Sequence, residues 1–211
     1  MKNVLVVCGH TDPNSLCTAL AHAYVDGAKA TGAEVRLLHL GELNFDPVLR
    51  LGYTQVQALE PDLQTAQEWL LWAEHTVWVY PNWWGSMPAI LKGFFDRVFL
   101  PGFAFKYRKN SSLWDRLLAG RSAHLMVTMD TPSWYYRWFL GRPGHIQMKR
   151  TILEFCGIKV KKLSEFAPVR GSQEDQRHAW LECDRSFGKE PSRFLIGRIN
   201  YSVPLIDSHS R

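Results

Sequence analysis

Short apolar runs that alternate with segments of helical periodicity constrain the fold of this chain more than any other feature. Runs such as VLVVC and TVWVY are rich in β-branched residues and are typical of buried parallel strands. Together with three further segments, they predict strands at residues 3–8, 34–40, 76–80, 123–128 and 158–166. Because strand and helix alternate strictly, the sequence predicts an α/β fold: a parallel five-stranded sheet with helices on both faces, in three layers.

The segments between the runs carry helix signals. Gly32 is placed to end the first helix, Pro88 to begin the third, and Ser172 with Asp175 forms a capping-box pattern at the last. We expect helices at residues 15–31, 62–75, 88–98, 146–155 and 172–187, and irregular structure at 100–106 and 129–144.

The pattern predicts a single domain over residues 1–188 and a C-terminal extension of unknown role at 189–211. There is no run of eighteen apolar residues, and the opening MKNVLVVCGH is typical of a first strand rather than a signal peptide. The four cysteines form no CxxC pair and have no zinc-site spacing, so we expect free thiols and no metal. We therefore expect a cytoplasmic protein without a membrane span.

The net charge of +5 comes from lysines and arginines that are scattered along the chain. No helix or loop concentrates them, so we do not expect nucleic-acid binding, whereas a mildly basic surface suits anionic nucleotide cofactors. Nine tryptophans exceed what a core of this size usually needs. Aromatic side chains suit planar ligands and subunit interfaces.

Ligands of open parallel sheets bind beyond the carboxyl ends of the strands, so the loops after residues 8, 80 and 128 are the candidate site. The first loop, GHTDPNSLC, ends where a helix begins at Ser15, and its free N–H groups form an anion site to which His10 adds a donor. The loop has neither glycine pattern of the common nucleotide motifs. The alternative is an ordinary turn at residues 12–14 with Ser15 as the helix cap.

The second and third loops are aromatic. In PNWWGS, Gly85 allows the backbone to approach a flat ligand, and backbone amides could hydrogen-bond the edge of a heterocycle. In the alternative interpretation, Trp83 and Trp84 pack into the core or into a subunit contact. The third loop, TMDTPSWYYRW, is either a ring-stacking lid or a subunit-interface patch.

The stretch PNWWGSMPAILKGFFDRVFLPGFAF, residues 81–105, resembles the signature of flavodoxin-like NAD(P)H quinone oxidoreductases. These are relatives of the mammalian quinone reductases and of the bacterial drug-activity modulator and potassium-efflux ancillary proteins. His10 followed by Ser15, and the Phe155-Cys156-Gly157 sequence, also match, so the resemblance covers roughly residues 3–188. It implies a flavodoxin-like fold, bound FAD or FMN, NAD(P)H as co-substrate, two-electron reduction of a small quinone-like acceptor, and a homodimer.

The resemblance also implies roles for individual residues. The flavin phosphates would be held by His10, Ser15, Leu16 and Cys17, and the isoalloxazine would be lined by Pro81, Asn82, Trp83, Trp84 and Gly85. The dimethylbenzene or pyrimidine side of the ring would be contacted by Thr128, Met129, Asp130 and Thr131. Arg177 falls where the mammalian enzymes place an arginine beside adenine, which favours FAD, with FMN as the alternative. The alternative role for Arg177 is a surface ion pair with Glu174.

The chain departs from the mammalian pattern in its third loop, which is not glycine-rich. Tyr135 lies where the family places a tyrosine near the flavin, and His145 is the nearest candidate for the catalytic histidine. We expect ping-pong hydride transfer, because donor and acceptor would occupy the same place. The alternatives are a flavin-binding regulatory subunit of a potassium-efflux-type transporter and an electron-carrier flavodoxin, although carriers are strongly acidic and this chain is basic.

Overall fold

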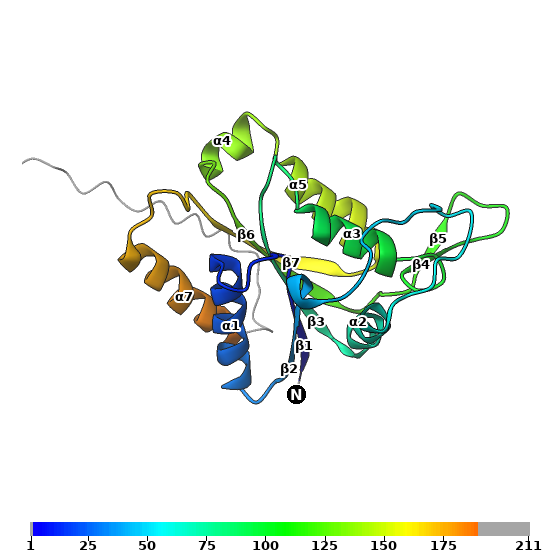
Figure 1. The fold of residues 1–211 in the computed structure, drawn as a ribbon, viewed down its shortest axis with the longest axis horizontal. Coiled ribbons are helices and arrows are strands. Elements are labelled where there is room, and N and C mark those ends of the chain that lie inside the picture. The colour runs from blue at the N-terminus through cyan, green and yellow to red at the C-terminus, as the bar shows by residue number, and fades with distance from the viewer. Residues whose placement is uncertain (1, 190–211) are drawn as a thin grey trace, which may run out of the picture.

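The computed structural model describes residues 2–189 and has the predicted five-stranded parallel sheet (Figure 1). The strand order is β2-β1-β3-β6-β7, and every neighbouring pair is parallel. The strands are β1 (Asn3–Cys8), β2 (Glu34–His39), β3 (His75–Pro81), β6 (Ser122–Thr128) and β7 (Lys159–Phe166). The predicted strands are therefore confirmed, with small shifts at their ends.

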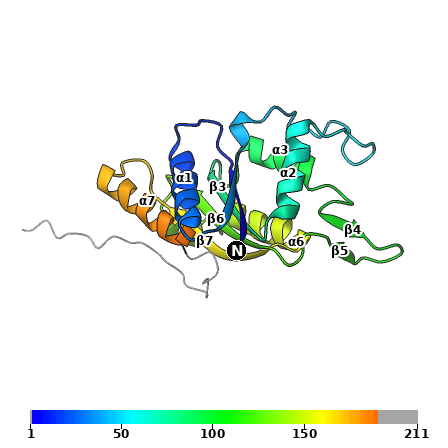
Figure 2. The ribbon, with the colours of Figure 1, turned by 90° about the horizontal axis from the view of Figure 1, so that it is seen from below.

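Helices cover both faces of the sheet, as Figures 1 and 2 show together. On one face lie α1 (Leu16–Lys29) and α7 (Glu174–Lys189); on the other lie α2 (Pro61–Trp72), α3 (Ala89–Val98) and a helix assembled from α5 (Pro143–Ile146), a π-helical segment (Gln147–Leu153) and α6 (Glu154–Cys156). Successive residues of β1 alternate between two apolar cores, Leu5 in one and Val6 in the other. The prediction of a flavodoxin-like three-layer sandwich is confirmed.

Three short elements were not expected from the sequence. The region predicted to be irregular at 129–144 contains α4 (Ser133–Trp138), and a small antiparallel hairpin joins β4 (Phe105–Tyr107) to β5 (Trp114–Arg116). A 3-10 turn (Leu40–Glu42) follows β2. These elements are too short to have a readable period.

The predicted capping box at the last helix is wrong. Helix α7 begins at Glu174, two residues later than the pattern indicated. The Ser172 hydroxyl instead donates to the carbonyl of Val169 and accepts from Arg177 Nε, at 2.7 and 2.9 Å. The predicted extension beyond Lys189 lies outside the described residues.

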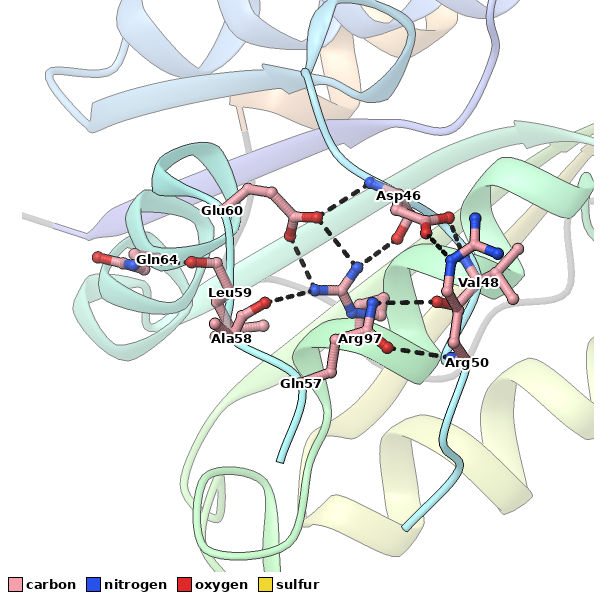
Figure 3. Close-up of polar contacts among 9 residues, drawn as sticks. All are labelled: Asp46, Val48, Arg50, Gln57, Ala58, Leu59, Glu60, Gln64 and Arg97. Carbon is pink, nitrogen blue, oxygen red and sulfur yellow. Dashed lines mark hydrogen bonds and ion pairs between the residues drawn. The ribbon is translucent and has the colours of Figure 1, made fainter. Parts of the chain in front are cut away.

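A buried arginine organises the long segment between β2 and α2 (Figure 3). Arg97 of α3 is 1% exposed and donates to both carboxylate oxygens of Glu60, at 3.2 and 2.8 Å. It also donates to the carbonyl oxygens of Asp46 and Ala58. The carboxylate of Glu60 in turn accepts from the N–H of Asp46, so the two ends of the segment are tied to one another and to α3.

Among residues 2–189, no helix is both long and apolar enough to cross a membrane.

Candidate functional site

The three candidate loops leave the carboxyl ends of neighbouring strands β1, β3 and β6, and they touch one another. The N–H of Asn82 donates to the carbonyl of Thr128 at 2.7 Å, which joins the second loop to the third. Cys17 Sγ lies 3.2 Å from Thr128 Oγ1, which joins the first loop to the third. The rings of His10 and Trp83 meet edge to face at 5.4 Å between centroids, which joins the first loop to the second.

The first loop presents free donors at the start of α1. Ser15 caps the helix: its hydroxyl accepts from the N–H of Thr18 at 3.2 Å. The N–H groups of Leu16 and Cys17 therefore point out of the first turn without an intrahelical partner, where the helix dipole favours an anion. The cap and the anion site are thus compatible interpretations of the same residues.

His10, in the same loop, is a neutral donor. Burial lowers the pKa of His10, and the nearby Asp12 opposes this only in part. Its Nδ1 accepts from the N–H of Asp12 at 2.9 Å, so the proton of the neutral ring resides on Nε2. The ring can therefore donate one hydrogen bond from its outer edge.

The side chain of Cys17 faces inward. It is 2% exposed, and burial raises the pKa of its thiol to about 12, so it stays protonated at neutral pH. Only its backbone N–H is available to a phosphate, and the thiol has no nucleophilic character.

The second loop is a tight turn of residues 83–86. Trp83 and Ser86 exchange both backbone hydrogen bonds, at 2.9 and 3.0 Å, and Trp84 and Gly85 both have positive φ, 53° and 78°. Two positive φ angles in succession are the geometry of a type I′ turn. Trp84 is fully exposed, so burial of this indole in the core is excluded. Neither Trp84 nor Gly85 donates its N–H within the described residues.

The outer end of the turn is hydrogen-bonded to α4 and to the segment that follows it. The carbonyl of Gly85 accepts from the hydroxyl of Tyr136 at 2.8 Å and from the N–H of Gly144 at 3.0 Å. The hydroxyl of Ser86 donates to Gln147 at 2.7 Å. Two hydrogen bonds to the Gly85 carbonyl and one from the Ser86 hydroxyl therefore hold the turn from outside its own strand.

The residues of the third loop diverge. Thr128 stays at the junction of the three loops, but the side chain of Met129 is buried in the core. Asp130 points the other way and accepts from the N–H of Arg170 at 2.8 Å. Beyond them, α4 exposes an aromatic patch, which we define as Trp134, Tyr135, Trp138 and Phe139.

The two catalytic candidates lie in different surroundings. Tyr135 belongs to the aromatic patch and stacks on Phe139 at 5.1 Å between centroids. His145 is 5% exposed, and its Nε2 lies 2.9 Å from Glu165. Burial on its own would raise the pKa of Glu165, but hydrogen bonds from His145 and Ser133 outweigh it and the pKa is lowered. His145 therefore faces a buried carboxylate, and its ring packs on Tyr136 rather than on Tyr135.

Arg177 makes local contacts at the start of α7. Its guanidinium donates to the hydroxyl and the carbonyl of Ser172, at 2.9 and 3.1 Å. Glu174, the ion-pair partner considered for it, lies 3.7 Å from His178 instead.

Comparison with known proteins decides the family. The pattern of the flavodoxin-like fold family matches residues 2–182. A human ribosyldihydronicotinamide dehydrogenase [quinone] is 30% identical, over 90% of this chain and 93% of its own length. The chain belongs to the flavodoxin-like NAD(P)H quinone oxidoreductase family.

Two further proteins are similar to this chain over most of their own length. An uncharacterized NAD(P)H oxidoreductase of Haemophilus influenzae is 28% identical, over 85% of this chain and 91% of its own. A solved structure from Streptococcus mutans UA159 superposes with a TM-score of 0.77 at 30% identity, over 89% of this chain and 98% of the other. This chain is accordingly an oxidoreductase enzyme.

The sequence did not single out Tyr136, whose hydroxyl connects α4 to the turn at residues 83–86. Tyr136 is 0% exposed, whereas its neighbour Tyr135 is 41% exposed. The only signal was the Tyr135-Tyr136 pair itself, because adjacent residues of a helix point in different directions, so that one can be buried while the other is exposed.

Proposed function

We propose that this protein is a flavin-dependent NAD(P)H oxidoreductase that reduces quinones or similar acceptors by two electrons. The observation that carries the proposal is the meeting of two sets of free backbone donors at one edge of the sheet. One set, at Leu16 and Cys17, suits a phosphate; the other, at Trp84 and Gly85, suits the edge of a flat heterocycle. A flavin nucleotide has both groups.

The residues present fit such a cofactor. Its phosphate would be held by the N–H groups of Leu16 and Cys17 with His10 Nε2, and its ring system would lie along the turn at Trp84 and Gly85. When bound, a flavin supplies hydride and two-electron chemistry between a nicotinamide and a quinone. The turn would orient the ring, and the indole of Trp83 would exclude water from one side of it.

We further propose ping-pong kinetics, a homodimer and a cytoplasmic location. Donor and acceptor would stack over the same turn and exclude one another. The aromatic patch on α4 has the composition of a subunit interface. Within residues 2–189, Cys8, Cys17 and Cys156 are thiols that form no disulfide, which favours a reducing compartment.

The choice between FAD and FMN depends on Arg177. The groups that meet at the three loops suffice for FMN, and FAD would need the guanidinium of Arg177 to leave Ser172 for the adenine end. We retain FAD as the proposed cofactor and FMN as the alternative. The effect of Arg177→Ala on the affinities for the two flavins distinguishes between them.

The first test replaces one phosphate donor and leaves the fold intact. Leu16 is the first residue of α1, where proline is tolerated, and Ser15 before it has φ −75° and ψ 159°, which a following proline accepts. Leu16→Pro therefore removes the N–H without breaking the helix, and it also removes the leucine side chain that packs on the core beside α1, as Leu16→Ala does. We expect flavin affinity to fall about tenfold or more, the effect of losing a bond to a charged group. Leu16→Ala, which keeps the N–H, is the control.

The second test follows turnover. Anaerobic NADPH or NADH should bleach the blue absorption of the reconstituted protein, and a menadione-like quinone should restore it. Initial rates with both substrates varied should give parallel double-reciprocal lines. Intersecting lines would contradict the ping-pong scheme, and protein that cannot be bleached by either nucleotide would contradict the oxidoreductase function.

A further inference from the structure

We infer that Tyr136 is a positioning residue that locks the turn at residues 83–86 in the conformation that presents the Trp84 and Gly85 amides. What the turn binds rests on the proposed function, whereas the lock rests on contacts within this chain.

The turn is strained at Trp84. A φ of 53° lies in the left-handed region, which a bulky residue rarely adopts, and type I′ turns usually have Asn or Gly at that place. Such a conformation persists only where surrounding contacts over-determine it. Contacts from outside the turn must therefore hold it.

Those contacts converge on the carbonyl of Gly85. The hydroxyl of Tyr136 donates to this oxygen at 2.8 Å and accepts from the N–H of Gly144 at 3.0 Å, while Gly144 also donates to the same carbonyl. Burial raises the pKa of Tyr136, so its hydroxyl remains a neutral donor across the physiological range. The carbonyl between Gly85 and Ser86 is thereby fixed in direction.

There is no space for a side chain where Gly144 packs against the turn. A Cβ at Gly144 would lie 2.7 Å from the Gly85 carbonyl oxygen, 2.9 Å from Ser86 Cα and 3.0 Å from the Tyr136 hydroxyl. Fixing the Gly85 carbonyl fixes the peptide plane between Gly85 and Ser86, and the N–H of this plane closes the turn on the carbonyl of Trp83. The orientation of the Trp84 and Gly85 N–H groups, which follow in the same two-residue turn, is restricted with it.

The segment that carries Tyr136 is itself anchored. The N–H of Arg142 donates to the carbonyl of Tyr136 at 3.0 Å, and Arg142 and His145 lie 3.5 and 2.9 Å from the carboxylate of Glu165 at the end of β7. The ring of Tyr136 packs edge to face on His145. The strand end, the loop before α5 and the turn therefore form one connected unit.

The adjacent tyrosine provides a matched control. Tyr136→Phe deletes one hydroxyl and keeps the buried ring, and Tyr135→Phe deletes the same atom from an exposed ring that stacks on Phe139. In flavin-free protein, we expect Tyr136→Phe to shift or broaden the amide resonances of Trp84 and Gly85, with Tyr135→Phe leaving them in place. Far-UV circular dichroism confirms that each variant is folded.

With flavin, we expect Tyr136→Phe to raise the Kd at least tenfold and to alter the visible spectrum of the bound cofactor. Ser86→Ala, which removes the separate tether to Gln147, should act in the same direction if Tyr136→Phe proves too unstable to titrate. Unchanged turn resonances and an unchanged Kd in Tyr136→Phe would overturn the lock. Wild-type protein that binds no flavin would instead overturn the proposed function, and the resonances in flavin-free protein would still decide the lock.

Discussion

Replacing Arg97 by methionine should cost a large part of the stability of this protein. Arg97 is 1% exposed and ties the segment between Asp46 and Glu60 to α3 through bonds to one carboxylate and two carbonyl groups. Methionine keeps most of the apolar volume but leaves the Glu60 carboxylate without its cation and the carbonyls without a donor. Breaking a buried ion pair from one side costs about 3–5 kcal/mol.

Thermal unfolding measures this directly. At about 2–4 °C per kcal/mol for a domain of this size, the Tm should fall by roughly 10 °C. The side chain of Glu60 is 29% exposed, so solvent screens part of the interaction and the lower half of the range applies. Hydrogen bonds from Arg97 hold the pKa of Glu60 below its usual value despite desolvation. The contribution of the pair is therefore present at neutral pH and is lost as the pH falls through the pKa of the folded protein.

A second ion pair on the same helix is the control. Lys92 and Asp96 lie 2.7 Å apart and are exposed, so Lys92→Met should change the Tm by about 1–2 °C at most. A double-mutant cycle of Arg97→Met with Glu60→Gln should give a coupling free energy above about 1 kcal/mol. A loss for Arg97→Met no larger than that for Lys92→Met would refute the reasoning.

Three further predictions concern buried or candidate groups. Burial lowers the pKa of His75 to about 4, so its contribution to stability is present above pH 6.5 and is lost as the pH falls toward 4. His75→Asn should therefore reduce the slope of the unfolding free energy against pH between pH 6.5 and 4 by up to about 1.4 kcal/mol per pH unit, measured by urea titration. Burial raises the pKa of Asp184 against the opposing charge of Lys162, and its carboxylate oxygens have no hydrogen-bond partner among residues 2–189. Asp184→Asn should therefore raise the Tm at pH 7 and give no gain at pH 3, and a lower Tm at pH 7 would contradict this. Arg177→Ala should weaken FAD more than FMN in fluorescence titrations, and equal effects would leave Arg177 as a contact of Ser172 only and FMN as the cofactor.

The layered fold follows from local sequence, which is why it could be predicted. The central strands β1 and β3 are nearly continuous apolar runs, and Gly157 caps α6 in the left-handed conformation that glycine adopts readily. Helix α1 ends at Lys29 with Ala30 as its cap, two residues before the Gly32 that the sequence indicated. The loops that hold the candidate site follow from the rule for strand ends in parallel sheets. Ser15 as the cap of α1 was also readable from its residue type and place.

The contacts that support the candidate site could not be predicted from the sequence, because they join residues that are far apart along the chain. Tyr136 meets Gly85 across 51 residues, and Arg97 meets Asp46 across another 51. Nothing in the local pattern distinguishes Tyr136 from Tyr135, since α4 has only six residues and no complete apolar period. The capping-box pattern at Ser172 failed for a different, local reason: the guanidinium of Arg177, five residues further on, donates to the Ser172 hydroxyl.

The visible spectrum of the purified protein tests the central claim most directly. Native protein, incubated with excess FAD or FMN and freed of unbound cofactor, should be yellow, absorb in the blue and release one flavin per chain on denaturation. Leu16→Pro should retain less flavin than Leu16→Ala at the same protein concentration. Folded wild-type protein that stays colourless after incubation with either flavin would contradict the account.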